Sequence, residues 1–190
     1  MRILMDVEGY SWNDAWNIGT KSVAYTNHTV LAEALERWPQ QLIEKWLPRI
    51  WQIIVEISNR WQRKVEDFYH DMGKTQAMAI VWGGEVRMAN LCICACYAVN
   101  GVSALHSEIL KKDVFHDAYT MHPEQFKNVT NGIDHRRWLS GINPGLDSLS
   151  RDLTGGEDYL MQPLVLRKPN DEADDAAVLK ALADIKRNNK

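Results

Sequence analysis

The stretch 88-MANLCICACYAVNGV-102 decides the fold class of this chain. Residues 88–99 are apolar apart from Asn90, without alternation. Such a run fits a strand buried on both faces, as in a parallel sheet, although periodicity alone does not separate it from a buried helix. Asn100-Gly101 then indicates a turn, and residues 102–112 a helix. The stretch therefore predicts strand, turn and helix, which is half of a βαβ unit. A second glycine, needed for a dinucleotide fingerprint, is absent from this turn.

Helical patterns surround this unit. The strongest covers residues 49–72, where apolar side chains recur at three- and four-residue steps. Shorter helices are predicted at residues 12–24, 32–37 and 40–46, after Pro144, and at residues 175–187. Residues 113–143 look irregular, and residues 153–175 have the glycines, prolines and acidic run of a flexible connection. The predicted fold class is mainly α with a few strands, partly α/β.

Composition excludes several classes of function. The chain has 190 residues, 45% hydrophobic and 25% charged, with a net charge of −3, which is typical of a globular protein. No basic face dominates, so we expect no nucleic-acid partner. The longest apolar run is far shorter than the roughly 20 residues of a membrane span, and the first residues lack a signal sequence. We therefore expect no membrane partner and a cytoplasmic location.

The three cysteines stand at positions 92, 94 and 96. An odd number within so short a segment does not indicate a disulfide framework. Zinc sites space paired ligands differently and need further ligands from elsewhere. We therefore expect small buried hydrophobic residues and no metal site.

Packing does not explain three polar stretches, which are 25-YTNHTV-30, 97-YAVNGV-102 and 130-TNGIDHRRWL-139. The second stretch follows the predicted strand, where ligands of α/β sheets bind. All three offer amide, hydroxyl or imidazole groups, which suit a neutral ligand rich in hydroxyls. Each also has a structural alternative: a hydrogen-bonded His28, a generic turn at Asn100-Gly101, and a surface pair at Arg136-Arg137.

Four segments together resemble the glycogen/maltodextrin (α-glucan) phosphorylase family, in a bacterial-type form. They are 25-YTNHTVLAEALERWP-39, 88-MANLCI-93, 98-AVNGVSALHSEILKK-112 and 126-FKNVTNGIDHRRWLSGINPGL-146. Their order and spacing match as well as their content, and the resemblance runs from Trp12 to Leu149. The tail after Leu153 matches poorly.

The resemblance implies a pyridoxal 5′-phosphate enzyme of GT-B architecture, with two Rossmann-like domains. Such enzymes cleave the terminal α-1,4 bond of glycogen or maltodextrin with inorganic phosphate, and release glucose 1-phosphate with retention of configuration. The 5′-phosphate of the cofactor acts as acid and base. This differs from the two-carboxylate chemistry of glycosidases.

The resemblance also assigns roles to individual residues. His28 matches the catalytic histidine that contacts the glucose hydroxymethyl group and the region of the anomeric carbon. Val102 matches the valine beside the same hydroxymethyl group, and Asn131 the asparagine that hydrogen-bonds the sugar. Trp138 and its neighbour Arg137 match the surroundings of the cofactor. Asn100 and Gly101 match turn residues that support Val102.

The resemblance implies a middle fragment of such an enzyme. Residues 1–131 would end the N-terminal domain and residues 132–190 would start the C-terminal domain, with a divergent tail. The cofactor lysine and the phosphate-binding residues of the family have no match here. We therefore expect an inactive isolated chain without covalently bound cofactor, whose exposed apolar faces favour a homo-oligomer. The alternatives are a non-catalytic carbohydrate-binding module and a helical protein-interaction module.

Overall fold

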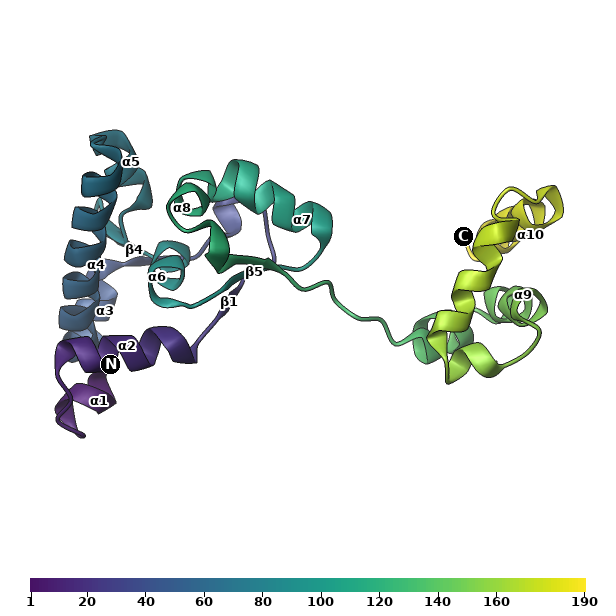
Figure 1. Ribbon diagram of the computed structural model, residues 1–190, viewed down its shortest axis with the longest axis horizontal. Helices are drawn as coiled ribbons and strands as arrows, with labels where there is room; N and C mark the ends of the chain where they lie inside the picture. Colours follow the sequence, from purple (N-terminus) through teal and green to yellow (C-terminus); the bar gives the residue numbers. More distant parts are fainter. The chain divides into compact units, whose positions relative to one another are not determined.

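The computed structural model describes the backbone of residues 1–190 and all side chains except those of residues 168–172. The chain divides into two compact units, Met1–Asn131 and Gly132–Lys190 (Figure 1). The predicted fold class, mainly helical with a few strands, is confirmed at this level. Whether the units are parts of two GT-B domains stays a prediction.

Helices form most of the first unit. They are α1 (Arg2–Asp6), α2 (Trp12–Ser22), α3 (Gln40–Trp46), α4 (Pro48–Tyr69), α5 (Met72–Met78), α6 (Met88–Ala95), α7 (Ala104–Ile109) and α8 (His116–Met121), with the short 3₁₀ helices η1 (Ala32–Ala34) and η3 (Pro123–Gln125) and the π-helix η2 (Leu110–Val114). The predicted helices at 12–24 and 40–46 are confirmed within two residues. Ser11 caps α2, because its hydroxyl accepts a hydrogen bond from the N–H of Asp14 at 3.2 Å.

A parallel sheet supports the three polar stretches, since β1 begins the first, β5 lies in the second and β6 precedes the third. Its strands are β1 (Tyr25–Thr26), β5 (Val99–Gly101) and β6 (Phe126–Asn128), in the order β1-β5-β6. Tyr25 pairs with Val99, and Val99 pairs with Phe126. The segment between β5 and β6 contains α7 and α8, of which α7 packs against both strands. The strands β5 and β6 with the helices between them therefore form a βαβ unit. The sequence predicted such a unit with its first strand at residues 88–99 and a turn at Asn100-Gly101, whereas Asn100 and Gly101 belong to β5 itself.

A second sheet is antiparallel, with β2 (Arg37–Pro39), β4 (Glu85–Arg87) and β3 (Val81–Trp82) in the order β2-β4-β3. Gly83 and Gly84 close the hairpin between β3 and β4 with φ angles of 63° and 81°. Two successive positive φ angles match a type I′ turn, which strongly favours glycine.

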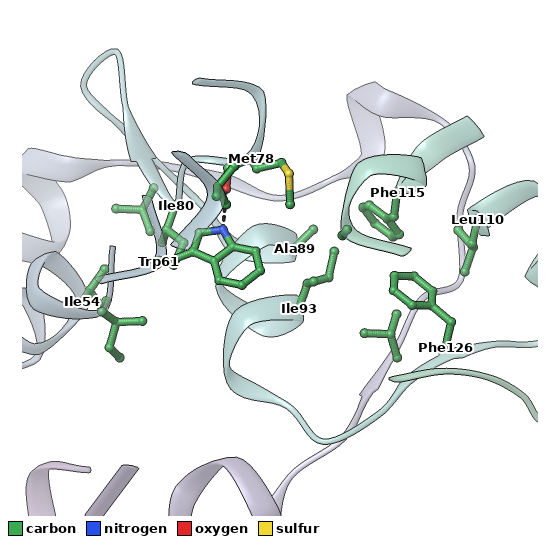
Figure 2. Close-up of a cluster of buried hydrophobic side chains, with 14 of the residues drawn as sticks. Ile54, Trp61, Met78, Ile80, Ala89, Ile93, Leu110, Phe115 and Phe126 are labelled. Atoms are coloured by element: carbon green, nitrogen blue, oxygen red, sulfur yellow. Dashed lines mark hydrogen bonds between the residues drawn. The ribbon is translucent and has the colours of Figure 1, made fainter. Parts of the chain in front are cut away.

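The long helix α4 organises the core. It buries Ile53, Ile54, Ile57, Trp61 and Val65 along one face. The indole N–H of Trp61 donates to the carbonyl oxygen of Met78 at 3.0 Å (Figure 2). The pattern at 49–72 predicted this helix correctly, except that α4 ends at Tyr69 and Met72 begins α5. His70, between them, has a left-handed φ of 51°.

The predicted strand at 88–99 is wrong for most of its length, because residues Met88–Ala95 form α6 and the strand β5 begins only at Val99. Ala89 and Ile93 of α6 belong to the core cluster, with Leu91 and Cys94 packed against it. A helix covered on several sides is as continuously apolar as a buried strand, and methionine, alanine and leucine favour the helix. Asn90 fits the same arrangement, since its side-chain amide donates to the carbonyls of Ala77 and Ala79.

Two further predictions are corrected. In residues 32–37 only the 3₁₀ turn η1 is helical, and Arg37 already belongs to β2. Trp38, which precedes Pro39, is biased toward extended backbone, and Arg37–Pro39 pair with β4. The segment 113–143, predicted to be irregular, contains α8, η3 and β6. Elements of three to six residues carry too little periodicity to be recognised.

The second unit contains η4 (Arg136–Gly141), α9 (Pro144–Thr154), η5 (Asp158–Leu160), η6 (Pro163–Glu172) and α10 (Ala176–Asn188). The helix predicted after Pro144 and the last helix are confirmed. The predicted flexible connection at 153–175 is wrong around Tyr159, which is completely buried and whose hydroxyl hydrogen-bonds to Asp147 of α9. The side chains at 168–172 of that segment lie outside the described residues.

Candidate functional site

Three loops meet at the carboxyl edge of the parallel sheet, because strands that run in the same direction end at the same edge. The N–H of Asn27, after β1, donates to the carbonyl of Asn100 at 2.9 Å. The N–H of Asn131, after β6, donates to the carbonyl of Val102 at 3.3 Å. His28, Val102 and Asn131 therefore stand on adjacent loops at one edge of the first unit.

Asn27 shapes the loop that carries His28. It is only 2% exposed. Its side-chain oxygen accepts the N–H of Thr29 at 2.9 Å, and its amide donates to the hydroxyl of Tyr25 at 3.0 Å. An asparagine that bonds to the backbone two residues onward makes a turn without glycine. His28, at the centre of this turn, is exposed. No role was predicted for Asn27 from the sequence, although asparagine is a residue that favours turns.

The hydroxyl of Tyr25 stays neutral beneath this loop. Burial raises the pKa of Tyr25, and the hydrogen bond from Asn27 opposes this shift only in part. The sheet edge is therefore supported here by uncharged groups, which suits the neutral ligand expected from the sequence.

His106 contacts two of the three loops. Its Nδ1 accepts the N–H of Val102 at 3.1 Å, and its Nε2 lies 3.5 Å from the carbonyl oxygen of Thr29. The sequence placed His106 inside a motif without assigning it a role, because the two contacts join residues that are far apart in the chain.

The helix α7 and the strand β5 approach each other closely at Gly101. A Cβ atom added at Gly101 would lie 2.8 Å from the Cα of Ser107 on α7. The Ser107 hydroxyl lies 2.9 Å from the side-chain oxygen of Asn128, at the end of β6. Gly101 is therefore required for its small size, and its neighbour Val102 is held at a defined distance from α7.

Arg137 and Trp138 lie in η4 of the second unit, whereas His28, Val102 and Asn131 lie in the first. The Arg137 guanidinium stands 5.1 Å from the centre of the Trp138 ring, which is 54% exposed. The N–H of Arg137 donates to the Asp134 carboxylate at 3.1 Å. The pair presents a cation and an aromatic face, and its role toward a cofactor stays a prediction.

The environment of the cysteines does not activate their thiols. Cys92 and Cys94 lie on α6 and Cys96 follows its end. Burial raises the pKa of Cys94 to about 12 and that of Cys96 to about 11, so both thiols are protonated at neutral pH. Among the side chains that the structure describes, no group of three or more His, Cys, Asp or Glu could hold a metal ion. No described helix is long and apolar enough to cross a membrane.

A cleft lies elsewhere in the first unit. It has a volume of about 470 Å³, and its lining includes Trp12, Trp16, Trp61 and His122. Cys96 and Gln125, which precede β5 and β6, also line it, so it opens at the amino edge of the parallel sheet. His28, Val102 and Asn131 are not among its lining residues. We favour the carboxyl edge as the candidate site, since three loops with polar groups meet there.

Comparison with known proteins gives concordant matches. A family model described as carbohydrate phosphorylase matches residues 1–190. The chain is 47% identical over 194 aligned residues to the muscle form of glycogen phosphorylase from Mus musculus, and 46% identical to that from Homo sapiens. It is 44% identical to the liver form from Bos taurus. Each alignment covers 100% of this chain but 23% of the relative, so the chain spans about a quarter of the length of these proteins.

Proposed function

Because this chain belongs to the carbohydrate phosphorylase family, we propose that it forms the glucosyl-binding part of an α-1,4-glucan phosphorylase. The complete enzyme would use inorganic phosphate to release glucose 1-phosphate from glycogen or maltodextrin, with retention of configuration. The GT-B arrangement, the cytoplasmic location and the homo-oligomeric state expected from the sequence belong to the same proposal. The relatives support the reaction class, since those compared above are glycogen phosphorylases.

The observation that carries this proposal is the meeting of three loops at one edge of the parallel sheet. An imidazole, an isopropyl group and an amide come from His28, Val102 and Asn131 respectively. The amide offers both a donor and an acceptor to a sugar hydroxyl, and the isopropyl group offers an apolar face to the sugar carbons. Fixed amides of this kind discriminate well, because a ligand without the matching hydroxyl leaves them unpaired.

His28 would act by electrostatic stabilisation. A neutral imidazole and the carbonyl of its own loop present negative partial charge to a sugar whose anomeric carbon becomes positive in the transition state. Asn27 would contribute indirectly, since its two hydrogen bonds keep the loop in one conformation. Preorganisation of this kind avoids a reorganisation cost during the reaction.

The residues of this chain fit only part of a pyridoxal 5′-phosphate site. Arg137 and Trp138 would hold an edge of the cofactor, because a guanidinium suits a phosphate and an indole suits an aromatic ring. When bound, the cofactor supplies a phosphate group that exchanges a proton with the substrate phosphate. Lys74, whose amine binds the Asp117 carboxylate at 2.8 Å and has a raised pKa, is unsuited to covalent attachment. Since the cofactor lysine and the phosphate-binding residues of the family have no match in this sequence, we expect this chain alone to bind glucan without releasing glucose 1-phosphate.

Nuclear magnetic resonance of the 190-residue chain tests the proposal. Titration with maltopentaose should shift the backbone signals of His28, Val102 and Asn131, with a Kd on the order of millimolar because only part of the site is present. His28→Ala and Asn131→Ala should each weaken binding by about tenfold, the effect of losing roughly one good hydrogen bond. Cellopentaose, with β-1,4 bonds, serves as the ligand control.

His116→Ala is the matched control variant, since His116 lies on α8 with a side chain that is 59% exposed. It should leave maltopentaose binding unchanged. Shifts confined to the cleft around Trp12 and Trp16 would contradict the assignment of the site. Glucose 1-phosphate formation, or absorbance of a pyridoxal Schiff base in the purified chain, would contradict the expected inactivity. Specific binding by a natural chain that ends at Lys190 would instead support a non-catalytic carbohydrate-binding module.

A further inference from the structure

His106 is in a position to join the loops of the candidate site. The residue lies on α7, behind the sheet edge, and its side chain is half-buried. Its Nδ1 accepts the N–H of Val102 at 3.1 Å, so this nitrogen carries no proton. A neutral ring must then carry its proton on Nε2. The carbonyl oxygen of Thr29, 3.5 Å away, is the acceptor facing that N–H.

The peptide groups of Val102 extend this connection to the third loop. The N–H of Val102 binds His106, and its carbonyl accepts the N–H of Asn131 at 3.3 Å. The hydrogen bonds therefore run from Thr29 through the His106 ring to Val102, and from Val102 to Asn131. Val102 and Asn131 take part in this series of hydrogen bonds, and His28 immediately precedes Thr29. All three predicted sugar-contacting residues are therefore in the series or next to it.

The helix that carries the imidazole ring is itself held in place. The backbone N–H of His106 donates to the hydroxyl of Ser103 at 3.1 Å, and Ser103 thereby caps α7. The hydroxyl of Ser107 lies 2.8 Å from the Ser103 carbonyl and 2.9 Å from the Asn128 side chain. Since Gly101 leaves no space between β5 and α7, the helix cannot move closer to the strand to adapt the ring to another arrangement of the loops.

We propose that His106, in its Nε2–H form, is a positioning residue that holds the His28, Val102 and Asn131 loops as one rigid unit for glucan binding. The glucan part of this inference rests on the proposed function. His106 does not contact the sugar and acts only through the Thr29 carbonyl and the Val102 peptide. Its contribution is preorganisation, which improves affinity by reducing the ordering cost at binding.

The first test needs neither ligand nor variant. Long-range ¹⁵N–¹H correlation spectra of the histidine rings should show His106 with a proton on Nε2 and none on Nδ1 at pH 8. An Nδ1–H form would overturn the proposal, because it could not accept the Val102 N–H. This readout reports on the ring directly, so a general structural role would not produce it.

The second test compares variants whose side chains can replace one of the two ring nitrogens as a hydrogen-bonding group. The side-chain oxygen of asparagine occupies roughly the place of Nδ1, and the amide nitrogen of glutamine roughly the place of Nε2. His106→Asn should keep the hydrogen-exchange protection of the Val102 N–H and lose the link to Thr29. His106→Gln should do the reverse. His106→Ala should lose both, with about tenfold lower protection at Val102 and Asn131.

Maltopentaose affinity should decrease with the number of hydrogen bonds lost between the loops. We expect a decrease of about tenfold in His106→Ala and a smaller one in His106→Asn and His106→Gln. His116→Gln, at an exposed position on α8, is the control and should change neither readout. Unchanged protection at Val102 in His106→Ala would overturn the proposal even if glucan binds. A wild-type chain that gives no maltopentaose shifts would overturn the proposed function and the glucan role of His106. The exchange data would still decide whether His106 joins the loops.

Discussion

The substitution Gly101→Ala probes the contact on which the candidate site depends. A Cβ atom at position 101 would lie 2.8 Å from the Cα and 3.0 Å from the Cβ of Ser107, and closer still to its hydroxyl oxygen. The φ angle of Gly101 is not positive, unlike those of Gly83 and Gly84, so an alanine suffers no torsional strain there. The whole cost therefore comes from the collision between β5 and α7.

The magnitude follows from the distances. Carbon atoms prefer separations near 3.5–4.0 Å, so α7 must move away from β5 by about 1 Å. Overpacking of this kind costs about 1–3 kcal/mol. A shift of about 1 Å also stretches the Ser107–Asn128 and Val102–His106 hydrogen bonds, now 2.9 Å and 3.1 Å, beyond useful length. With about 1 kcal/mol for each hydrogen bond, we expect a loss of about 3–5 kcal/mol from the free energy of unfolding.

Thermal unfolding followed by tryptophan fluorescence measures this loss. Seven of the eight tryptophans lie in Met1–Asn131, so the signal reports mainly on that unit. The expected decrease in Tm is about 10–15 °C for a unit of this size. Gly19→Ala is the matched control in α2, because its Cβ would meet only the sulfur of Met1 at 3.8 Å. It should raise stability by about 0.5–1 kcal/mol, since alanine favours a helix over glycine.

A double variant makes the reasoning refutable. Ser107→Ala removes the hydroxyl oxygen that the new Cβ approaches most closely, so the cost of Gly101→Ala should be smaller in its presence. A Tm within about 2 °C of the wild type for Gly101→Ala would refute the close approach, because it would correspond to less than about 1 kcal/mol. Strict additivity in the double variant would refute the assignment of the collision to Ser107.

Three further predictions concern other parts of the chain. Trp61→Phe removes the buried donor to the Met78 carbonyl and should cost about 2–3 kcal/mol in chemical denaturation; a loss below about 0.5 kcal/mol would contradict this role. Cys94, whose pKa is raised to about 12 by burial, should react with a disulfide reagent at pH 8 far more slowly than in guanidinium chloride, and equal rates would contradict its burial. Hydrogen bonds from Tyr159 and then Arg151 lower the pKa of Asp147 to about 2, below its unfolded value of 3.8. Their stabilisation of the second unit should therefore be complete above about pH 5 and be lost as the pH falls toward 2, and Asp147→Asn should remove this dependence in acid unfolding curves.

The sequence predicted the helices that have a clear amphipathic period. The pattern at residues 49–72 identified α4, and the pattern at residues 175–187 identified α10. Each of these helices closes its hydrogen bonds within four residues, so local sequence contains most of the information that forms it. The same pattern failed at α6, because a helix buried on several sides shows no polar face from which a period could be recognised.

The strands needed the tertiary structure. β1 has two residues and β6 has three, too few to show alternation, and both depend on pairing with β5. Tyr25 finds its partner at Val99, across a long separation in the chain. No local pattern specifies such a pairing, since it becomes favourable only when the intervening helices are packed.

The candidate site divides in the same way. The long motifs in the sequence were sufficient to identify the family and to single out the three polar stretches with His28, Val102 and Asn131. Folding brings these stretches together at one edge of a parallel sheet. The tertiary structure also shows that Asn27 and His106 hold these loops, through hydrogen bonds from the N–H groups of Thr29 and Val102 respectively. The physical reason is that a motif fixes the type and order of residues along the chain. Which loops share a hydrogen bond depends on strand pairing and on the close packing of α7 against Gly101.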